Sequence, residues 1–162
     1  MNHLHAYWRM EYVENPHKKK SGARTFIDLL AEDSDEENLI LYRGPETFII
    51  MNRFPYNAGH LMVLPNRKVA ELEDLTESER TEIFEQVIHG KEILSKAIKP
   101  NGFNVGINLG SSAGAGIPGH LHIHIVPRWE GDTNFMPVLG QTHVLPTSLE
   151  SLYKRMKPFV RE

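Results

Sequence analysis

The sequence predicts an α+β domain in which one long helix packs on a mostly antiparallel sheet. Short apolar runs rich in Ile, Leu and Val recur along the chain between turn residues, a pattern that is typical of strands. Only one long segment, between Thr76 and Pro100, keeps apolar residues at helical spacing. The connections between the strands are too short for repeated parallel crossovers, so the sheet is expected to be antiparallel.

The expected strands are short apolar runs, most of them bounded by Gly, Pro or Asn. They are Asn38–Arg43, Thr47–Met51, His60–Leu64, Phe103–Leu109 and Leu121–Val126. Residues 44–46, Gly-Pro-Glu, are expected to form a tight hairpin turn between the first two strands. Ahead of them, we expect a short ordered element at Thr25–Leu30 and a solvated acidic loop at Ala31–Glu37.

The long helix is expected to begin at Thr76, because Glu79 stands three residues later and completes a capping box. Pro100 follows its end, and Gly90 is a mild weak point within it. The helix is interpreted as scaffold, with His89 on its surface. A second, short helix is expected at Ser148–Met156.

Length and composition indicate a single soluble domain. The chain has 162 residues, of which 40% are hydrophobic and 24% are charged, and its formal net charge is -3. That charge argues against a duplex nucleic acid as a partner but leaves a small anionic ligand open. There is no cysteine, which excludes disulfides and thiol nucleophiles. No signal peptide or membrane-spanning segment is recognisable, so the cytoplasm is the expected location and no membrane partner is expected.

Three histidines alternate along one expected strand, at His120, His122 and His124. Alternate side chains of a strand share a face, so the three imidazoles should line one wall while the residues between them enter the core. A purely structural role is disfavoured, since three polar rings on an apolar strand need partners that a plain core does not supply. A metal site is disfavoured as well, because the outer two residues are roughly 13 Å apart at the backbone.

The remaining interpretation is phosphoryl or nucleotidyl transfer. A neutral imidazole is a good nucleophile, whereas a protonated one stabilises phosphate charge, so neighbouring histidines can divide these roles. The loop upstream of the triad, residues 110–119, is rich in small residues whose backbone amides can approach an anion. Ser111, Gly114 and Gly116 are its candidate substrate-binding residues. The loop is neither a Walker loop nor a dinucleotide fingerprint.

The residues 120–126, His-Leu-His-Ile-His-Ile-Val, closely resemble the signature of the histidine-triad family, His-x-His-x-His followed by two apolar residues. A second segment, residues 52–65 from Asn52 to Pro65, resembles that family's Asn-Arg and Gly-His strand and turn. The resemblance covers about residues 25–130. It implies a division into an N-terminal arm (1–24), a catalytic domain (25–130) and a C-terminal extension packed on that domain (131–162).

The resemblance also implies a fold and a chemistry. The fold is a five-stranded antiparallel sheet with helices, commonly paired into a homodimer, and it binds a nucleotide along the histidine wall. His122 would attack the α-phosphate and form a nucleotidyl-histidine, with His120 and His124 stabilising charge and assisting the leaving group. Three further residues match positions that contact the substrate: Asn52 near the ribose, Asn108 near the phosphates, and the additional histidine His60.

Two flanking regions, residues 7–12 and 126–137, resemble a subgroup that acts on diadenosine polyphosphates, including diadenosine tetraphosphate phosphorylases. Arg128 and Asn134 are candidates for extra phosphate or acceptor contacts. The Gly-Gln-Ser/Thr that precedes the triad in many relatives is replaced here by residues 115–119, Ala-Gly-Ile-Pro-Gly. The Cys-x-x-Cys that holds structural zinc in many relatives is missing from Ser21–Asp28, so we expect no structural zinc and no other tightly bound cofactor. Mg²⁺ could accompany a polyphosphate substrate.

The leading hypothesis is therefore an enzyme that cleaves a dinucleoside polyphosphate at the phosphate attacked by His122. Whether water or phosphate accepts the nucleotidyl group stays open. A nucleoside phosphoramidase would share the covalent step and differ in its leaving group. A nucleotide-binding module with little turnover is the alternative from another class.

Overall fold

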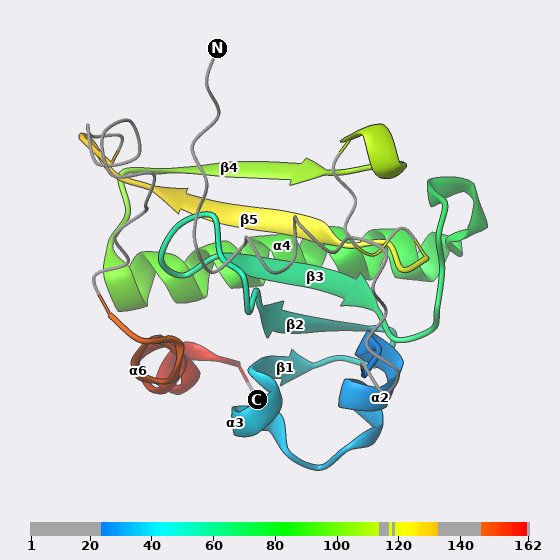
Figure 1. Cartoon of the computed structure of the whole chain (residues 1–162), viewed down its shortest axis with the longest axis horizontal. Coiled ribbons are helices and arrows are strands. Elements are labelled where there is room, and N and C mark those ends of the chain that lie inside the picture. The colour runs from blue at the N-terminus through cyan, green and yellow to red at the C-terminus, as the bar shows by residue number, and fades with distance from the viewer. Residues whose placement is uncertain (1–23, 114–116, 118, 133–146, 162) are drawn as a thin grey trace.

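A computed structural model describes residues 24–113, 117, 119–132 and 147–161. The expected N-terminal arm therefore lies almost wholly outside the described residues. Within them, the fold class is confirmed: a five-stranded, fully antiparallel sheet in the order β1-β2-β3-β5-β4 carries one long helix and several short ones. Figure 1 shows the sheet with this helix, α4, behind it.

The strands agree with the expected segments to within two residues at each end. They are β1 (Ile40–Arg43), β2 (Thr47–Met51), β3 (Leu61–Pro65), β4 (Gly102–Ile107) and β5 (Ile123–Arg128). Every residue of β2 and β3 is buried, and α4 packs against both strands. At one edge of the sheet, β4 is exposed over its last four residues.

The long helix α4 (Glu77–Ile98) begins as predicted, with Thr76 and Glu79 forming the capping box. Gly90 is better explained as a close contact than as a weak point. A Cβ at this position would lie 2.8 Å from Cδ1 of Ile125 on β5, so the glycine lets α4 approach the sheet. Since Ile125 faces α4, the alternation of β5 turns the neighbouring His124 toward the opposite face.

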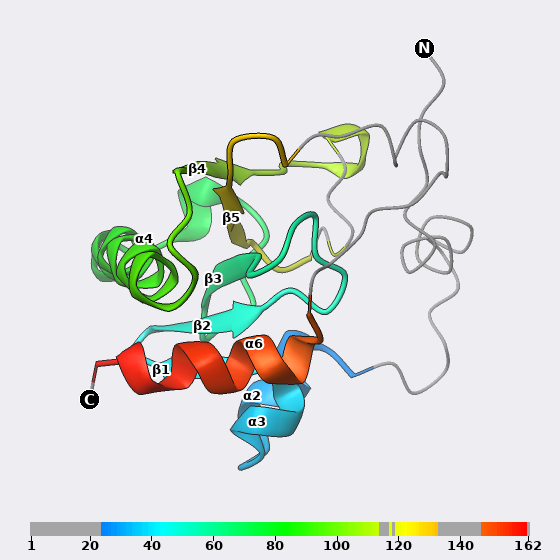
Figure 2. The ribbon, with the colours of Figure 1, turned by 90° about the vertical axis from the view of Figure 1, so that its left-hand side faces the viewer.

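The short helices gather at the β1 edge of the sheet, as Figure 2 shows. They are α2 (Phe26–Ala31), α3 (Asp35–Asn38) and α6 (Leu149–Met156), the last agreeing with the predicted short helix. On α6, Leu152, Tyr153 and Met156 are buried in the core. The end of the chain thus packs on the sheet and on α4.

The expectation of an acidic loop at Ala31–Glu37 is wrong for its last residues, where α3 forms. Leu39 takes a left-handed conformation (φ 63°), and its N–H bonds to carbonyls of the short helix. The Arg43 side chain pairs with Asp35 and also donates hydrogen bonds to two backbone carbonyls of the preceding turn. A cation from β1 therefore holds an acidic segment that has no apolar pattern of its own.

The expectation that His89 lies on the surface is wrong: the side chain is 3% exposed. Its Nε2 accepts a hydrogen bond from the Arg161 N–H, which leaves Nδ1 to donate to Gln86, and Tyr42 packs edge-on against the ring. Burial lowers the pKa of His89, so the neutral ring is the folded form. The partner that buries it is 72 residues away in sequence, at the C-terminus.

We expect His89→Ala to lower the free energy of unfolding by roughly 1–3 kcal/mol, because it leaves buried polar groups without partners. The pKa of His89 is depressed in the folded state, so its contribution is present above the unfolded value of 6.5 and is lost as the pH falls. Urea unfolding between pH 5 and 8 should show a weaker pH dependence in the variant, given that His120 and His122 still contribute. Glu85→Ala, on the exposed side of α4, is the control. Equal pH dependence in both variants would contradict this account.

Candidate active site

The histidine triad lies at the beginning of β5, where strand pairing stops. The prediction that all three histidines belong to the strand is wrong, because β5 begins at Ile123, after His120 and His122. If the register that pairs Val63 with Ile123 continued, Leu64 would lie opposite His122 and Pro65 opposite Leu121. Proline has no N–H to donate, so the ladder ends there and Leu121 bonds instead to the Val69 carbonyl.

Two backbone carbonyls beside this break accept hydrogen bonds from imidazole rings. His122 Nδ1 lies 2.8 Å from the carbonyl oxygen of His120, and His120 Nε2 lies 2.9 Å from that of Pro65. A carbonyl only accepts, so each of these ring nitrogens carries a hydrogen. In its neutral form, His122 therefore holds its lone pair on Nε2, and His120 holds its own on Nδ1.

Burial keeps both of these rings neutral. His120 and His122 are 3% and 8% exposed, and burial lowers the pKa of each below the usual value of 6.5. The Phe26 ring lies edge-on to His120 and tilted toward His122, with centroids 5.5 and 6.1 Å away. The apolar ring contributes to the desolvation that favours a neutral nucleophile over an imidazolium.

His124 is held by a second chain of hydrogen bonds. His60 Nδ1 accepts from the Tyr56 N–H at 3.1 Å, so the neutral His60 ring carries its hydrogen on Nε2. That nitrogen donates to His124 Nδ1 at 2.9 Å, which leaves the hydrogen of a neutral His124 ring on Nε2. Nε2 lies 3.3 Å from the Asn108 amide, whose oxygen accepts the hydrogen when the amide is turned toward the ring.

The structure brings His60, Asn108 and the triad together. The His122 and His124 ring centroids are 4.8 Å apart, and those of His60 and His124 are 5.0 Å apart. Asn52 joins the same group, although its contacts are with the protein: its Nδ2 lies 3.3 Å from His60 Nδ1, and its Oδ1 accepts from the Phe54 N–H. The ribose contact expected of Asn52 stays a prediction.

A tight turn places His60 at the end of β3. Gly59 has a φ of 77°, and a Cβ there would lie 2.6 Å from Ile98 on α4, so a larger residue would be strained and crowded. The His60 N–H bonds to the Asn57 carbonyl, and its own carbonyl accepts from the Asn52 N–H. The glycine that precedes His60 is thus required by the backbone that orients the imidazole.

Part of the predicted phosphate loop cannot be placed. Ser111 belongs to the short 3₁₀ helix η2 (Ser111–Ala113), while Gly114 and Gly116 lie outside the described residues. Asn134, proposed as a phosphate contact, lies outside them too. The substrate-binding role of Ser111, Gly114 and Gly116 and the phosphate or acceptor contact of Asn134 stay predictions.

Arg128, the other candidate for a phosphate contact, is held by an acidic partner. Its guanidinium makes a two-pronged contact with the Asp132 carboxylate at 2.6 and 2.7 Å and also donates to Asn104. The hydrogen bonds that Arg128 donates to Asp132 raise the pKa of Arg128. This pairing closes the turn after β5 and offsets the charge that a phosphate contact would use.

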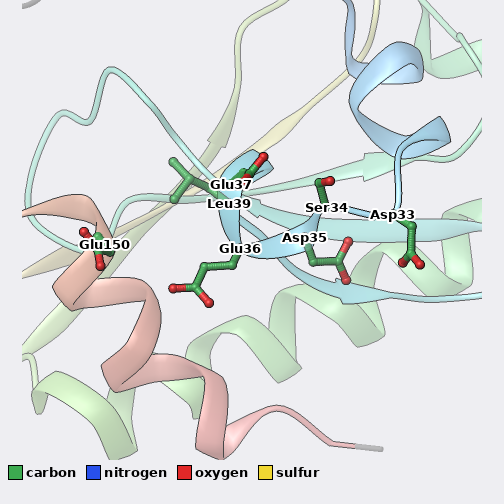
Figure 3. Close-up of a pocket in the computed structure, with 7 residues that line it drawn as sticks. All are labelled: Asp33, Ser34, Asp35, Glu36, Glu37, Leu39 and Glu150. Carbon is green, nitrogen blue, oxygen red and sulfur yellow. The ribbon is translucent and has the colours of Figure 1, made fainter.

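A separate hollow of about 740 Å³ lies between α3 and α6, away from the histidines. Figure 3 shows its acidic lining, with Asp33, Asp35, Glu36 and Glu37 on one side and Glu150 of α6 on the other. Such a surface repels phosphates, so the hollow is not the site for a nucleotide. Among the residues that the structure describes, no three His, Asp or Glu side chains are grouped so as to hold a metal ion.

Comparison with known proteins agrees with this geometry. A family model described as the HIT domain matches residues 34–131, more than half of the chain. The chain belongs to the HIT, or histidine-triad, family. It is 42% identical over 148 residues to the AP-4-A phosphorylase of Mycobacterium tuberculosis (strain ATCC 25618 / H37Rv), an alignment that covers 88% of this chain and 75% of the relative.

Other HIT proteins share less of the chain. The asymmetrical bis(5'-nucleosyl)-tetraphosphatase of Schizosaccharomyces pombe is 37% identical over 93 residues, which cover 57% of this chain and half (50%) of that protein. A hypothetical histidine triad nucleotide-binding protein from Sulfolobus tokodaii has a solved structure that superposes with a TM-score of 0.62 at 26% identity. It covers 75% of this chain and 82% of its own. No helix in the described part of this HIT protein is long and apolar enough to cross a membrane. The cytoplasmic location stays a prediction.

Three residues that contact the site were not assigned a role from the sequence. Phe26 and Tyr56 pack against the imidazoles, and Lys68 lies beside the backbone at Gly119. Nothing in the local pattern distinguishes them, since each belongs to a turn or a short element. Only the spatial neighbourhood of the triad identifies them.

The two carbonyl contacts predict the tautomers of the triad. In ¹⁵N-labelled protein at pH 7.5, we expect a hydrogen on Nδ1 of His122 and on Nε2 of His120. Both rings should titrate below 6.5, because burial lowers each pKa. The measurement is a long-range ¹H–¹⁵N spectrum recorded over a pH series. An Nε2-protonated His122 would contradict the proposed position of the nucleophilic lone pair.

Proposed function

We propose that this HIT protein cleaves dinucleoside polyphosphates of the diadenosine tetraphosphate type through a nucleotidyl-histidine on His122. The observation that carries the proposal is the hydrogen bond from His122 Nδ1 to the His120 carbonyl. It leaves the lone pair of a buried, neutral imidazole on Nε2, where it can attack phosphorus. Two relatives whose names specify nucleoside tetraphosphate chemistry support the choice of substrate.

In the first step, His122 Nε2 forms a bond to the α-phosphorus as the bond to the bridging oxygen breaks. The attacking ring gains positive charge, and the His120 carbonyl, which accepts from Nδ1–H, stabilises that charge without reorganising. Tetraphosphate cleavage at this position releases ATP. In the second step, an acceptor oxygen attacks the same phosphorus and the ring leaves as a neutral imidazole.

His124 is assigned the stabilisation of the leaving oxygen. The hydrogen bonds from Tyr56 N–H through His60 place a hydrogen on His124 Nε2, and a donor in that place can bond to the bridging oxygen as negative charge develops there. His60 acts through His124, so it is a positioning residue. Mg²⁺ is proposed to arrive with the polyphosphate, whose oxygens are the ligands that it prefers.

Phosphate is the proposed acceptor in the second step, which makes the enzyme a phosphorylase. The M. tuberculosis relative named AP-4-A phosphorylase aligns over 88% of this chain, whereas the S. pombe tetraphosphatase aligns over only 57%. The products with phosphate would be ATP and ADP, and with water they would be ATP and AMP.

A homodimer is proposed through the free edge of β4. Val105 and Ile107 on this edge strand, and Leu109 just after it, are 48%, 37% and 45% exposed. An apolar edge strand whose outer backbone groups are unpaired within the sheet is a ready surface for pairing with a second copy. The homodimer that the family resemblance implies would cover it.

The first test is the identification of the products from diadenosine tetraphosphate and Mg²⁺, with and without inorganic phosphate. We expect ADP together with ATP when phosphate is present. His122→Asn should lower turnover by at least about 10³-fold while it retains nucleotide binding, because the amide keeps the shape of the ring edge but not its nucleophilicity. AMP and ATP under both conditions would identify a hydrolase. No turnover by the wild type would contradict the substrate assignment and direct attention to phosphoramidates.

The dimer is tested with Val105→Lys and Ile107→Lys combined. Two like charges on each copy should prevent pairing of the β4 edges, so the variant should sediment at half the mass of the wild type. Phe84→Lys, on the exposed side of α4 at 72% exposure, provides the matched control and should leave the mass unchanged. A wild type that sediments as a monomer at micromolar concentration would overturn the proposal.

A further inference from the structure

Lys68 lies beside the backbone that leads into the triad. It belongs to the turn that follows β3, and a Cβ built on Gly119 would be 3.4 Å from its Cε and 3.8 Å from its Nζ. The next residue along the chain is His120. The lysine stem therefore lies close to Gly119, and its ammonium lies close to the residue that precedes His120.

Within the residues that the structure describes, the charge of Lys68 is not used by the fold. The side chain is exposed, and it makes no hydrogen bond or ion pair within the described part of the chain. Its neighbour Arg67 is the opposite case, because it is bound to the Glu79 carboxylate and to the Asp74 carbonyl. Of these two adjacent cations, Arg67 is bound to a residue of α4, whereas Lys68 is available to interact with a ligand.

The charge of Lys68 affects the pKa of His120 in the triad. Burial is the main cause of the lowered pKa of His120, and the charges of His122 and Lys68 lower it further. No carboxylate acts on His120 in the same way among the described residues. An anion that enters beside His120 therefore meets an ammonium that is not paired with any carboxylate of the described residues.

We propose that Lys68 binds the phosphate group next to the attacked phosphorus, both when it is leaving and when it is about to bond. This proposal rests on the function proposed above. In the first step this group is the β-phosphate of the leaving polyphosphate. In the second step it is the incoming inorganic phosphate. One ammonium serves both because the two groups occupy the same place.

In-line displacement requires that the leaving β-phosphate and the incoming phosphate occupy the same place. His122 Nε2 attacks opposite the leaving oxygen, so that oxygen departs from the face remote from the ring. The acceptor oxygen must then attack opposite Nε2, from that same face, as the P–N bond breaks. The incoming phosphate consequently stands where the leaving β-phosphate stood, and a fixed cation stabilises the charge in both transition states.

The test compares Lys68→Met with Lys68→Arg on two substrates. Diadenosine tetraphosphate has a phosphate next to the attacked phosphorus, whereas adenosine 5'-phosphoramidate has an amine there, and both form the same nucleotidyl-histidine. We expect Lys68→Met to lower kcat/KM for the tetraphosphate by roughly tenfold to a hundredfold, the value of one charged hydrogen bond. Hydrolysis of the phosphoramidate should change by less than about twofold, and Lys68→Arg should recover most of the loss.

The contact with the acceptor phosphate is measured in a separate experiment, which uses the phosphoramidate reaction with inorganic phosphate present. The ratio of ADP to AMP gives the partition of one intermediate between phosphate and water, independent of the leaving group. Lys68→Met should lower this ratio by a similar factor, and the His120 pKa measured by NMR should rise. Lys96→Met, an exposed lysine on the distant part of α4, is the control and should behave as wild type.

Three results would overturn the proposal. They are an unchanged rate with the tetraphosphate, an equal loss with both substrates, and an ADP to AMP ratio that stays constant while the tetraphosphate rate falls. An unchanged rate would show that Lys68 does not contact the β-phosphate. An equal loss with both substrates would show that the substitution acts through the structure. A constant ratio would show that Lys68 does not bind the incoming phosphate. Failure of the proposed function has a different appearance, namely a wild type that does not cleave the tetraphosphate at all.

Discussion

The hydrogen bond between the His122 ring and the His120 carbonyl lies where a proline in the neighbouring strand ends the sheet pairing. Pro65 has no N–H, so the pairing of β3 with β5 cannot extend to the beginning of the triad. The backbone of His120 and His122 therefore leaves the ladder, and carbonyls that a longer strand would have used accept from imidazoles instead. The tautomers of both rings, and with them the position of the nucleophilic lone pair, follow from where the sheet stops.

The four buried histidines of the site satisfy their hydrogen bonds as neutral rings. His60, His120, His122 and His124 are all buried, and each is bonded to a backbone group, to an amide or to another imidazole. Burying four protonated rings so close together would be unfavourable by several kcal/mol, whereas neutral rings with fixed tautomers satisfy one another. Under the function proposed above, the charge that holds a polyphosphate would come from the substrate's Mg²⁺, from backbone amides and from Lys68.

The scaffold keeps these contacts rigid from the opposite face. Ile125 packs under Gly90 of α4, and the alternation of β5 directs His124 away from the helix. Gly59, strained by its positive φ and crowded by Ile98, anchors the turn that orients His60. Close packing on the α4 face thus determines ring positions on the catalytic face, and neither glycine is in contact with the triad itself.

The sequence by itself determined the fold class, the long helix with its Thr76 and Glu79 capping box, and the grouping of His60 and Asn108 with the triad. These features are local in sequence or belong to a recognisable family pattern, so periodicity, caps and motifs report them. The tertiary structure decided that His89 is buried against the C-terminus and that the triad begins outside its strand. It also decided that Lys68 lies over Gly119. Each of these depends on a partner some 50 residues or more away, and no local pattern encodes a contact that only folding brings together.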